Sequence, residues 1–169
     1  MQLTTGLRRE TLDAMGTVLR MAPQAAAMLH GSSKYPGIQG SVCFYPVWGG
    51  TLIAAEVVGL PYTDSGCPEG FLGFHLHEGS VCAGTAEDPF ADAKTHYNPG
   101  GCPHPEHAGD FPPLLSNMGY GLLMFYTARF LPEEVIGRTV IIHRLADDFH
   151  TQPSGNSGEK IACGEIQAI

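Results

Sequence analysis

Apolar and polar residues alternate with a period of two from about residue 37 onward, as expected for strands with one buried face. We interpret five stretches of this kind as strands: residues 39–45, 51–58, 71–77, 120–128 and 138–143. The first two are expected to pair with each other, because Trp48, Gly49 and Gly50 lie between them and suit a turn. The pattern therefore predicts a mainly β chain.

The N-terminal residues follow a different period. Apolar residues recur at helical spacing within residues 5–21, with acidic residues near the start, and predict a short amphipathic helix. This helix is expected to dock on the rest of the chain or to stay partly mobile. We accordingly divide the chain into a partly helical N-terminal extension, residues 1–34, and one folded domain, residues 35–169.

Composition and charge narrow the classes of function. The 169 residues are enough for one domain with its own core, and 22 glycines and 13 prolines indicate many turns and irregular loops. The net charge of -8 argues against binding to nucleic acid, because phosphate binding needs a basic face, and it makes an anionic substrate unexpected at first sight. No apolar run reaches the length of about 18 residues that would indicate a membrane span. The N-terminus lacks the continuous apolar stretch of a signal peptide, so the cytoplasm is the default expectation, with a secreted or periplasmic location left open.

Residues 78–119 show little periodicity and are rich in glycine, proline, aspartate and histidine. So long an irregular segment inside a compact domain usually serves a function. A lone buried histidine is most often a hydrogen-bonded core residue, but this segment and the strands beside it carry a whole group of potential metal ligands: His75, His77, His96, His104, His107, His143 and Asp110. We therefore predict metal binding.

The spacing of these residues indicates two kinds of metal site. His75 and His77 are two residues apart on a predicted strand, so both imidazoles point to one face and can bind one ion, while the residue between them turns into the core. His104, His107 and Asp110 follow at three-residue steps in a proline-rich loop that can surround a second ion. Three histidines with a carboxylate suit structural zinc, whereas three or four imidazoles without a carboxylate suit copper better.

The five cysteines are an odd number, so at least one thiol stays unpaired or reacts outside the chain. No two of them form a CxxC motif, which weighs against a zinc–thiolate site. Cys43 alternates with Val42 and Phe44 on a predicted strand and is expected to be a buried free thiol. Cys67 and Cys102 each precede a proline in a turn, and a disulfide between them is one option.

Five separated motifs, in order, resemble the copper/zinc superoxide dismutase family, in particular its bacterial type with short metal loops: Gly73-Phe-His-Leu-His-Glu78, His96-Tyr-Asn-Pro99, His107-Ala-Gly-Asp110, Gly137-Arg-Thr-Val-Ile-Ile-His143 and Gly155-Asn-Ser-Gly-Glu-Lys-Ile-Ala-Cys-Gly164. The resemblance covers roughly residues 37–166. It implies an all-β, Greek-key, immunoglobulin-like sandwich or flattened barrel with long metal-binding loops. It also implies an enzyme that converts superoxide to oxygen and hydrogen peroxide by copper(II)/copper(I) cycling, beside a structural zinc.

The resemblance further implies roles for individual residues. The ligands of copper would be His75, His77, His96 and His143. The ligands of zinc would be His96, His104, His107 and Asp110. His96 would therefore bridge both metals as imidazolate and carry a proton to the bound oxyanion, which makes it a catalytic residue. Asp147 would hydrogen-bond one ligand of each metal and so fix the orientation of both rings.

By the same resemblance, Cys82 and Cys163 form a disulfide that ties the long loop to the last strand. Lys160 stands where the family usually has an arginine beside the copper channel, and we expect it to attract superoxide and to take part in catalysis. The loop of zinc ligands and the segment of residues 143–160 are both short for the family. These departures leave a second hypothesis open, a non-catalytic zinc- or copper-binding domain on the same scaffold. The expected partners are superoxide and, in a homodimer, a second copy of the chain.

Overall fold

A computed structural model describes residue 13 and residues 16–18, 20–62 and 70–169 of the protein. The strands in these residues are β1 (Ala25–Gly31), β2 (Gln39–Val47), β3 (Gly50–Val58), β4 (Phe71–Leu72), β5 (Phe74–His77), β6 (Leu114–Leu115), β7 (Gly121–Thr127), β8 (Thr139–His143) and β9 (Lys160–Ala168). Two single-turn 3-10 helices, η1 (Ala91–Ala93) and η2 (Pro132–Glu134), interrupt the loops. No helix in the described part of the chain is long and apolar enough to cross a membrane.

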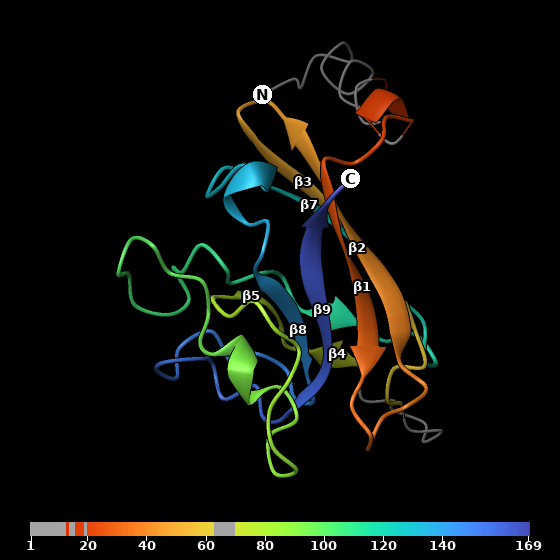
Figure 1. Ribbon diagram of the computed structural model, residues 1–169, viewed down its shortest axis with the longest axis vertical. Helices are drawn as coiled ribbons and strands as arrows, with labels where there is room; N and C mark the ends of the chain where they lie inside the picture. Colours follow the sequence, from red (N-terminus) through yellow and green to blue (C-terminus); the bar gives the residue numbers. More distant parts are fainter. Residues whose placement is uncertain (1–12, 14–15, 19, 63–69) are drawn as a thin grey trace, which may run out of the picture.

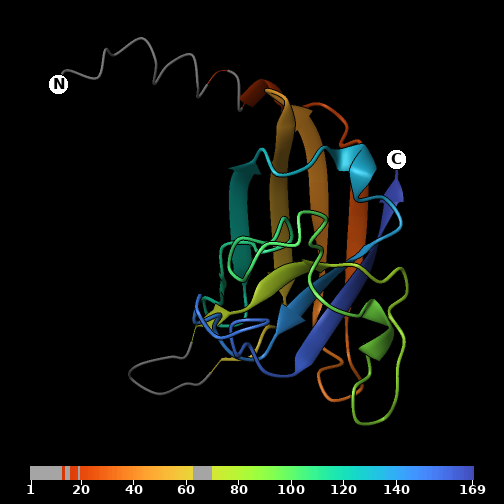
Figure 2. The same ribbon diagram turned by 90° about the vertical axis from the view of Figure 1, so that its left-hand side faces the viewer.

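Seven strands form one antiparallel sheet in the order β5-β8-β9-β1-β2-β3-β7, and β4 pairs with β6 in a small second sheet. The large sheet curls, so that β7, β3, β2 and β1 form one wall and β9, β8 and β5 cross in front of it (Figure 2). Two long loops, between β5 and β6 and between β8 and β9, lie beside β5 and β8 (Figure 1). The predicted all-β fold with long loops is confirmed.

The hydrophobic core lies inside the curl, and alternation along the strands explains it. On β1, for example, Ala25, Ala27 and Leu29 are buried while Met28 and His30 are exposed. All four residues of β5 are buried, because the core covers one face of this strand and loops cover the other. Leu76 belongs to the core cluster, so the alternating neighbours His75 and His77 point to the loop-covered face, as predicted. The core therefore fixes the strand on which the site is built.

Four of the five predicted strands correspond to β2, β3, β7 and β8. The prediction of one strand over residues 71–77 was wrong, because β4 and β5 belong to different sheets and Gly73 separates them. The Gly73 N–H donates to the Leu145 carbonyl at 2.7 Å, and its carbonyl accepts from the His143 N–H at 2.8 Å. A Cβ at Gly73 would meet Ser157, so only glycine allows the loop before β9 to approach here.

The predicted boundary between extension and domain also needs correction. Strand β1 lies within residues 1–34 yet pairs with β2 on one side and β9 on the other, in the middle of the sheet. The folded domain therefore includes this strand, since its removal would cut the sheet in two. Within the helix predicted over residues 5–21, residues 13 and 16–18 are helical, and residues 20 and 21 form a turn and a bend. The other residues of this predicted helix lie outside the described residues.

Candidate metal centre

Strands β5 and β8 position three of the histidines. His75 and His77 lie on β5, which pairs with β8, and His143 ends β8 where a bulge shifts its register against β9. The loop after β5 runs back along this strand: the Tyr97 N–H donates to the Leu76 carbonyl at 2.8 Å. It forms isolated bridges between His77 and His96 and between His75 and Asp110. The backbone of the loop thus brings its own ligands to the edge of β5.

The first cluster consists of four buried imidazoles whose nitrogens lie within 4.8 Å of one another: His75, His77, His96 and His143. The ring of His77 is oriented by its Nδ1, which lies 2.9 Å from the Lys94 carbonyl, and that of His143 by its Nδ1, 3.1 Å from the Gly158 carbonyl. A nitrogen that faces a carbonyl must carry the proton, so both Nε2 atoms present lone pairs. These two atoms face each other at 3.3 Å.

Two further nitrogens complete this cluster, because His75 Nδ1 and His96 Nε2 are buried and have no hydrogen-bond partner in the structure. A buried polar atom without a partner is costly and calls for an explanation. Four imidazole nitrogens that converge without protein partners are explained by a metal ion between them. The donor set fits copper, which favours imidazole ligands without carboxylate.

The second cluster shares His96 with the first and is completed by His104, His107 and Asp110. His96 Nδ1 lies 2.7 Å from Asp110 Oδ1, whereas His104 Nδ1 and His107 Nδ1 lie 3.1 and 3.3 Å from Oδ2 and make no hydrogen bond. Three imidazoles and one carboxylate in a buried, closed group fit zinc. His96 therefore faces the first cluster with one nitrogen and the second cluster with the other.

Asp147 connects the two clusters from behind. Its Oδ2 lies 2.7 Å from His75 Nε2, and its Oδ1 lies 2.9 Å from His104 Nε2, so each ring turns its Nδ1 toward a cluster. Burial raises the pKa of this carboxyl, but hydrogen bonds from His75, the Phe149 N–H and His104 outweigh burial and hold it well below its ordinary value. Asp147 is thus an anion that orients one ligand of each cluster. It was predicted for this place from the family resemblance.

Burial keeps three imidazoles of the first cluster neutral, those of His75, His77 and His143. Burial lowers the pKa of His75 to about 4 and that of His143 to about 3, and it lowers the pKa of His77 well below the ordinary value of 6.5. Neutral imidazole is the form that binds a metal. These three residues are therefore in their ligand form at neutral pH.

A cavity of about 650 Å³ leads to the first cluster and is lined by His77, His96 and His143. Lys160, which was expected beside the channel, also lines this cavity. Its Nζ, however, lies 2.6 Å from Asp88 Oδ2, so the expected guiding cation is paired with an acid. Sequence reasoning missed Asp88, because no motif marks a carboxylate that meets its partner only through the fold.

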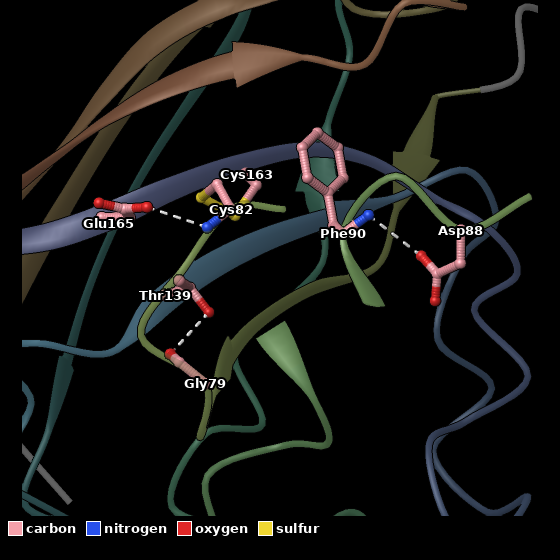
Figure 3. Close-up of a disulfide and its surroundings, with 7 residues drawn as sticks. All are labelled: Gly79, Cys82, Asp88, Phe90, Thr139, Cys163 and Glu165. Atoms are coloured by element: carbon pink, nitrogen blue, oxygen red, sulfur yellow. Dashed lines mark hydrogen bonds between the residues drawn. A yellow bond between two sulfur atoms is a disulfide. The ribbon is translucent and has the colours of Figure 1, made fainter. Parts of the chain in front are cut away.

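The disulfide between Cys82 and Cys163 that the resemblance implied is present, and it ties the loop after β5 to β9 (Figure 3). Glu165 accepts the Cys82 N–H at 2.9 Å and adds to this connection. Cys43 is free, as predicted, but only half-buried rather than buried, because its side chain lies on the outer face of β2. Cys102 is an exposed free thiol, which counts against the second disulfide; its suggested partner at position 67 lies outside the described residues.

The fold and these clusters define a β protein with two adjacent metal centres that share one histidine. Residues 38–166 match the family described as copper/zinc superoxide dismutase. The chain is 36% identical to a superoxide dismutase [Cu-Zn] of Deinococcus radiodurans, with 78% of this chain and 79% of that protein covered. It is 35% identical to superoxide dismutase [Cu-Zn] 2 of Aquifex aeolicus, over 70% of this chain and 72% of that protein.

A solved structure, the Cu/Zn superoxide dismutase from Brucella abortus, superposes with a TM-score of 0.71 at 27% sequence identity, over 85% of this chain and 99% of that one. The chain therefore belongs to the copper/zinc superoxide dismutase family. It is an enzyme of this type, and its cofactors are copper and zinc.

Proposed function

We propose that the protein dismutates superoxide with two metals per chain in unequal roles. Copper would be held by His75, His77, His96 and His143, and zinc by His96, His104, His107 and Asp110. The observation that carries this proposal is the convergence of buried imidazole nitrogens without protein partners at the end of an open cavity. Copper, when bound, supplies the one-electron oxidation and reduction that dismutation needs, whereas zinc has no redox chemistry.

The chain's own residues then have three tasks. The carbonyls of Lys94 and Gly158 and the carboxylate of Asp147 hold the ligand rings in place. His96 is the proton carrier: its Nδ1 belongs to the second cluster, so its Nε2 is the atom that can hold a proton beside the substrate. Two superoxide anions and two protons give one oxygen and one hydrogen peroxide, so a proton source at this position serves the reduction half. Lys160 would attract the small anion that enters the cavity, an attraction that its ion pair with Asp88 weakens.

Metal analysis combined with a superoxide-consumption assay tests this function against the alternative of a non-catalytic metal-binding domain. We expect about one copper and one zinc per chain after loading, and superoxide consumption that depends on copper. His77→Ala should abolish activity and leave the fold intact, because β5 keeps its core contacts. Asp110→Ala should mainly remove zinc and lower stability. A protein that binds both metals without consuming superoxide would instead support the alternative.

We also propose that the chain forms a homodimer through the outer face of β7. Leu122 and Tyr126 lie on this face with 60% and 42% exposure, and Trp48, 61% exposed, packs its ring edge-on against Tyr126. Apolar side chains gathered at a sheet edge favour an interface. Light scattering on the wild type and on Leu122→Glu would test this, and a monomeric wild type would contradict it. The expected absence of nucleic acid stays a prediction.

For the compartment, the disulfide between Cys82 and Cys163 supports an oxidising environment rather than the default cytoplasm. We therefore favour the secreted or periplasmic location that the sequence left open. Fractionation of the native source with thiol labelling is the direct measurement. Recovery of the chain in a reducing compartment with both thiols free would contradict the proposal.

A further inference from the structure

Lys160 and Asp88 form an ion pair in the wall of the cavity that leads to the proposed copper site. Lys160 Nζ and Asp88 Oδ2 are 2.6 Å apart, and the side chains are 15% and 44% exposed. Both residues line the cavity together with the imidazoles of His77, His96 and His143. An anion on its way to these imidazoles therefore meets a lysine whose charge is already balanced.

Asp88 is held in this position by its own turn. Its Oδ1 accepts the Phe90 N–H at 3.3 Å (Figure 3). Its Oδ2 accepts from the Lys160 ammonium at 2.6 Å. Its N–H donates to Thr85 Oγ1 at 3.2 Å, and its carbonyl accepts the N–H groups of Thr85 and Ala91 at 2.9 and 3.1 Å. Both carboxylate oxygens and both backbone groups of Asp88 are thus engaged, so the pair is a built contact rather than a chance meeting of surface side chains.

The disulfide connects the two segments that carry the pair. Cys82 precedes Asp88 by six residues on the loop, and Cys163 follows Lys160 by three residues on β9. Phe90 packs in one apolar cluster with Cys163, and Cys82 packs against the same cluster. Figure 3 shows Phe90 beside the disulfide, with Asp88 on the far side of the phenylalanine. The covalent bond and this cluster together bring Asp88 and Lys160 within reach of each other.

The other charged residues that line the cavity determine how much the ion pair affects the attraction of an anion. Glu78, Glu87 and Glu159 also line the cavity, while Lys94 is its second cation. Glu159 is bonded to Lys34 at 2.8 Å. Among the described residues, the Lys94 ammonium has neither an ion pair nor a side-chain hydrogen bond, and the residue is exposed. Lys94 is therefore the cavity cation whose charge no ion pair balances in the described part of the chain.

We propose that Asp88 is a positioning residue that restrains Lys160 and so limits anion entry, and that Lys94 supplies the unpaired positive charge in the resting enzyme. This inference rests on the proposed function, because it concerns the path by which superoxide would reach copper. Release of Lys160 from Asp88 adds a second free cation to the path and should increase anion affinity.

Azide, a small anion that binds to copper(II), is the probe. The full-length protein, loaded with copper and zinc, is titrated with azide at low salt, and binding is followed by the absorption spectrum. Asp88→Asn should raise azide affinity by about two- to tenfold, because one freed charge contributes only a small part of the attraction that all the charges of a protein exert on an anion. Glu87→Gln is the matched control: it removes one negative charge from the same cavity wall without breaking an ion pair, and should change affinity less. Lys94→Met should lower affinity by about two- to tenfold.

The same two substitutions, Asp88→Asn and Glu87→Gln, made in a Lys160→Met background, distinguish the effect of the ion pair from the effect of the total charge in the cavity. There, Asp88→Asn should have no larger effect than Glu87→Gln. Equal effects of the two substitutions in the wild-type background, or an Asp88→Asn effect that survives without Lys160, would overturn the inference. Thermal melts identify any variant that fails to fold. Amine labelling of the metal-free protein, read by mass spectrometry, gives a measurement independent of copper: Asp88→Asn should increase the labelling of Lys160 relative to Lys94, and an unchanged ratio counts against the pair.

Failure of this inference is distinct from failure of the proposed function. A wild type that consumes no superoxide when loaded removes the function, whatever the azide titrations give. An active wild type whose Asp88→Asn variant matches Glu87→Gln removes only the role of Asp88.

Discussion

Replacement of Asp147 by asparagine is the sharpest test of how the two metal sites are joined. The carboxylate accepts from His75 Nε2 at 2.7 Å and from His104 Nε2 at 2.9 Å, so one side chain orients a ligand in each cluster. Asparagine has nearly the same shape but only one acceptor oxygen, and its other terminal atom carries two donor hydrogens. At least one of the two imidazoles must therefore lose its acceptor and with it the fixed orientation of its Nδ1.

The size of the effect follows from these contacts. Loss of a carboxylate that supports a ligand histidine typically lowers metal affinity about 10- to 100-fold, or about 1.4–2.7 kcal/mol. Both rings are buried, so no water can replace the missing acceptor without a cavity to hold it. We expect a loss of this size for at least one metal, and a smaller loss for the other.

Competition titrations with chelators of known affinity, for copper and for zinc separately, measure the effect. Asp148→Asn is the control, because this neighbour also loses a charge, but its carboxylate bonds to His150 and Thr151 of its own turn and to no metal ligand. If Asp147→Asn keeps both affinities within about twofold of the wild type, Asp147 does not orient the ligands and the reasoning fails.

Two further predictions concern the stability of the protein. The disulfide between Cys82 and Cys163 closes a segment with a sequence separation of 81, for which the chain-entropy relation gives about 4.5 kcal/mol. The double serine variant should lose stability of that order in denaturant titrations, with Cys43→Ser as control; a loss below about 1 kcal/mol would contradict the estimate. For the metal-free protein, the folded pKa values of His75 and His143, about 4 and about 3, lie below the ordinary 6.5. Stability should therefore be present above pH 6.5 and fall as the pH drops toward 3, and a flat unfolding free energy over that range would refute it.

The strands with regular alternation were predictable, because β-branched and aromatic residues at every second position bury one face and leave few alternatives. Strand β1 was missed because its sequence begins with three alanines, Ala25–Ala27, which favour helix as readily as strand. Its assignment depends on two neighbours, β2 and β9, that meet it only in the folded sheet. Strand β9 was missed because four consecutive buried residues, Ile161–Gly164, hide its period.

The metal clusters were predictable for a different reason, since few arrangements other than a metal site gather so many histidines. Spacing alone grouped His75 with His77, and His104 with His107 and Asp110, whereas the family resemblance assigned His96 and His143. The pairing of Lys160 with Asp88 could not be predicted, because 72 residues separate them and the contact depends on how the loop folds around η1. Charges on loops are positioned by packing, and their partners leave no periodic signal in the sequence.

The division of ligands between rigid strands and loops has a consequence for assembly of the site. His75, His77 and His143 lie on strands whose positions the core determines, whereas the second cluster draws all its members from one loop. His96 and Asp147 each contact both clusters, so a metal bound in one cluster orders residues that the other needs. Binding free energies are linked reciprocally, so zinc should strengthen copper binding by the same factor by which copper strengthens zinc binding. The shared histidine and the shared buried carboxylate carry this coupling, because each metal fixes side chains that the other site uses.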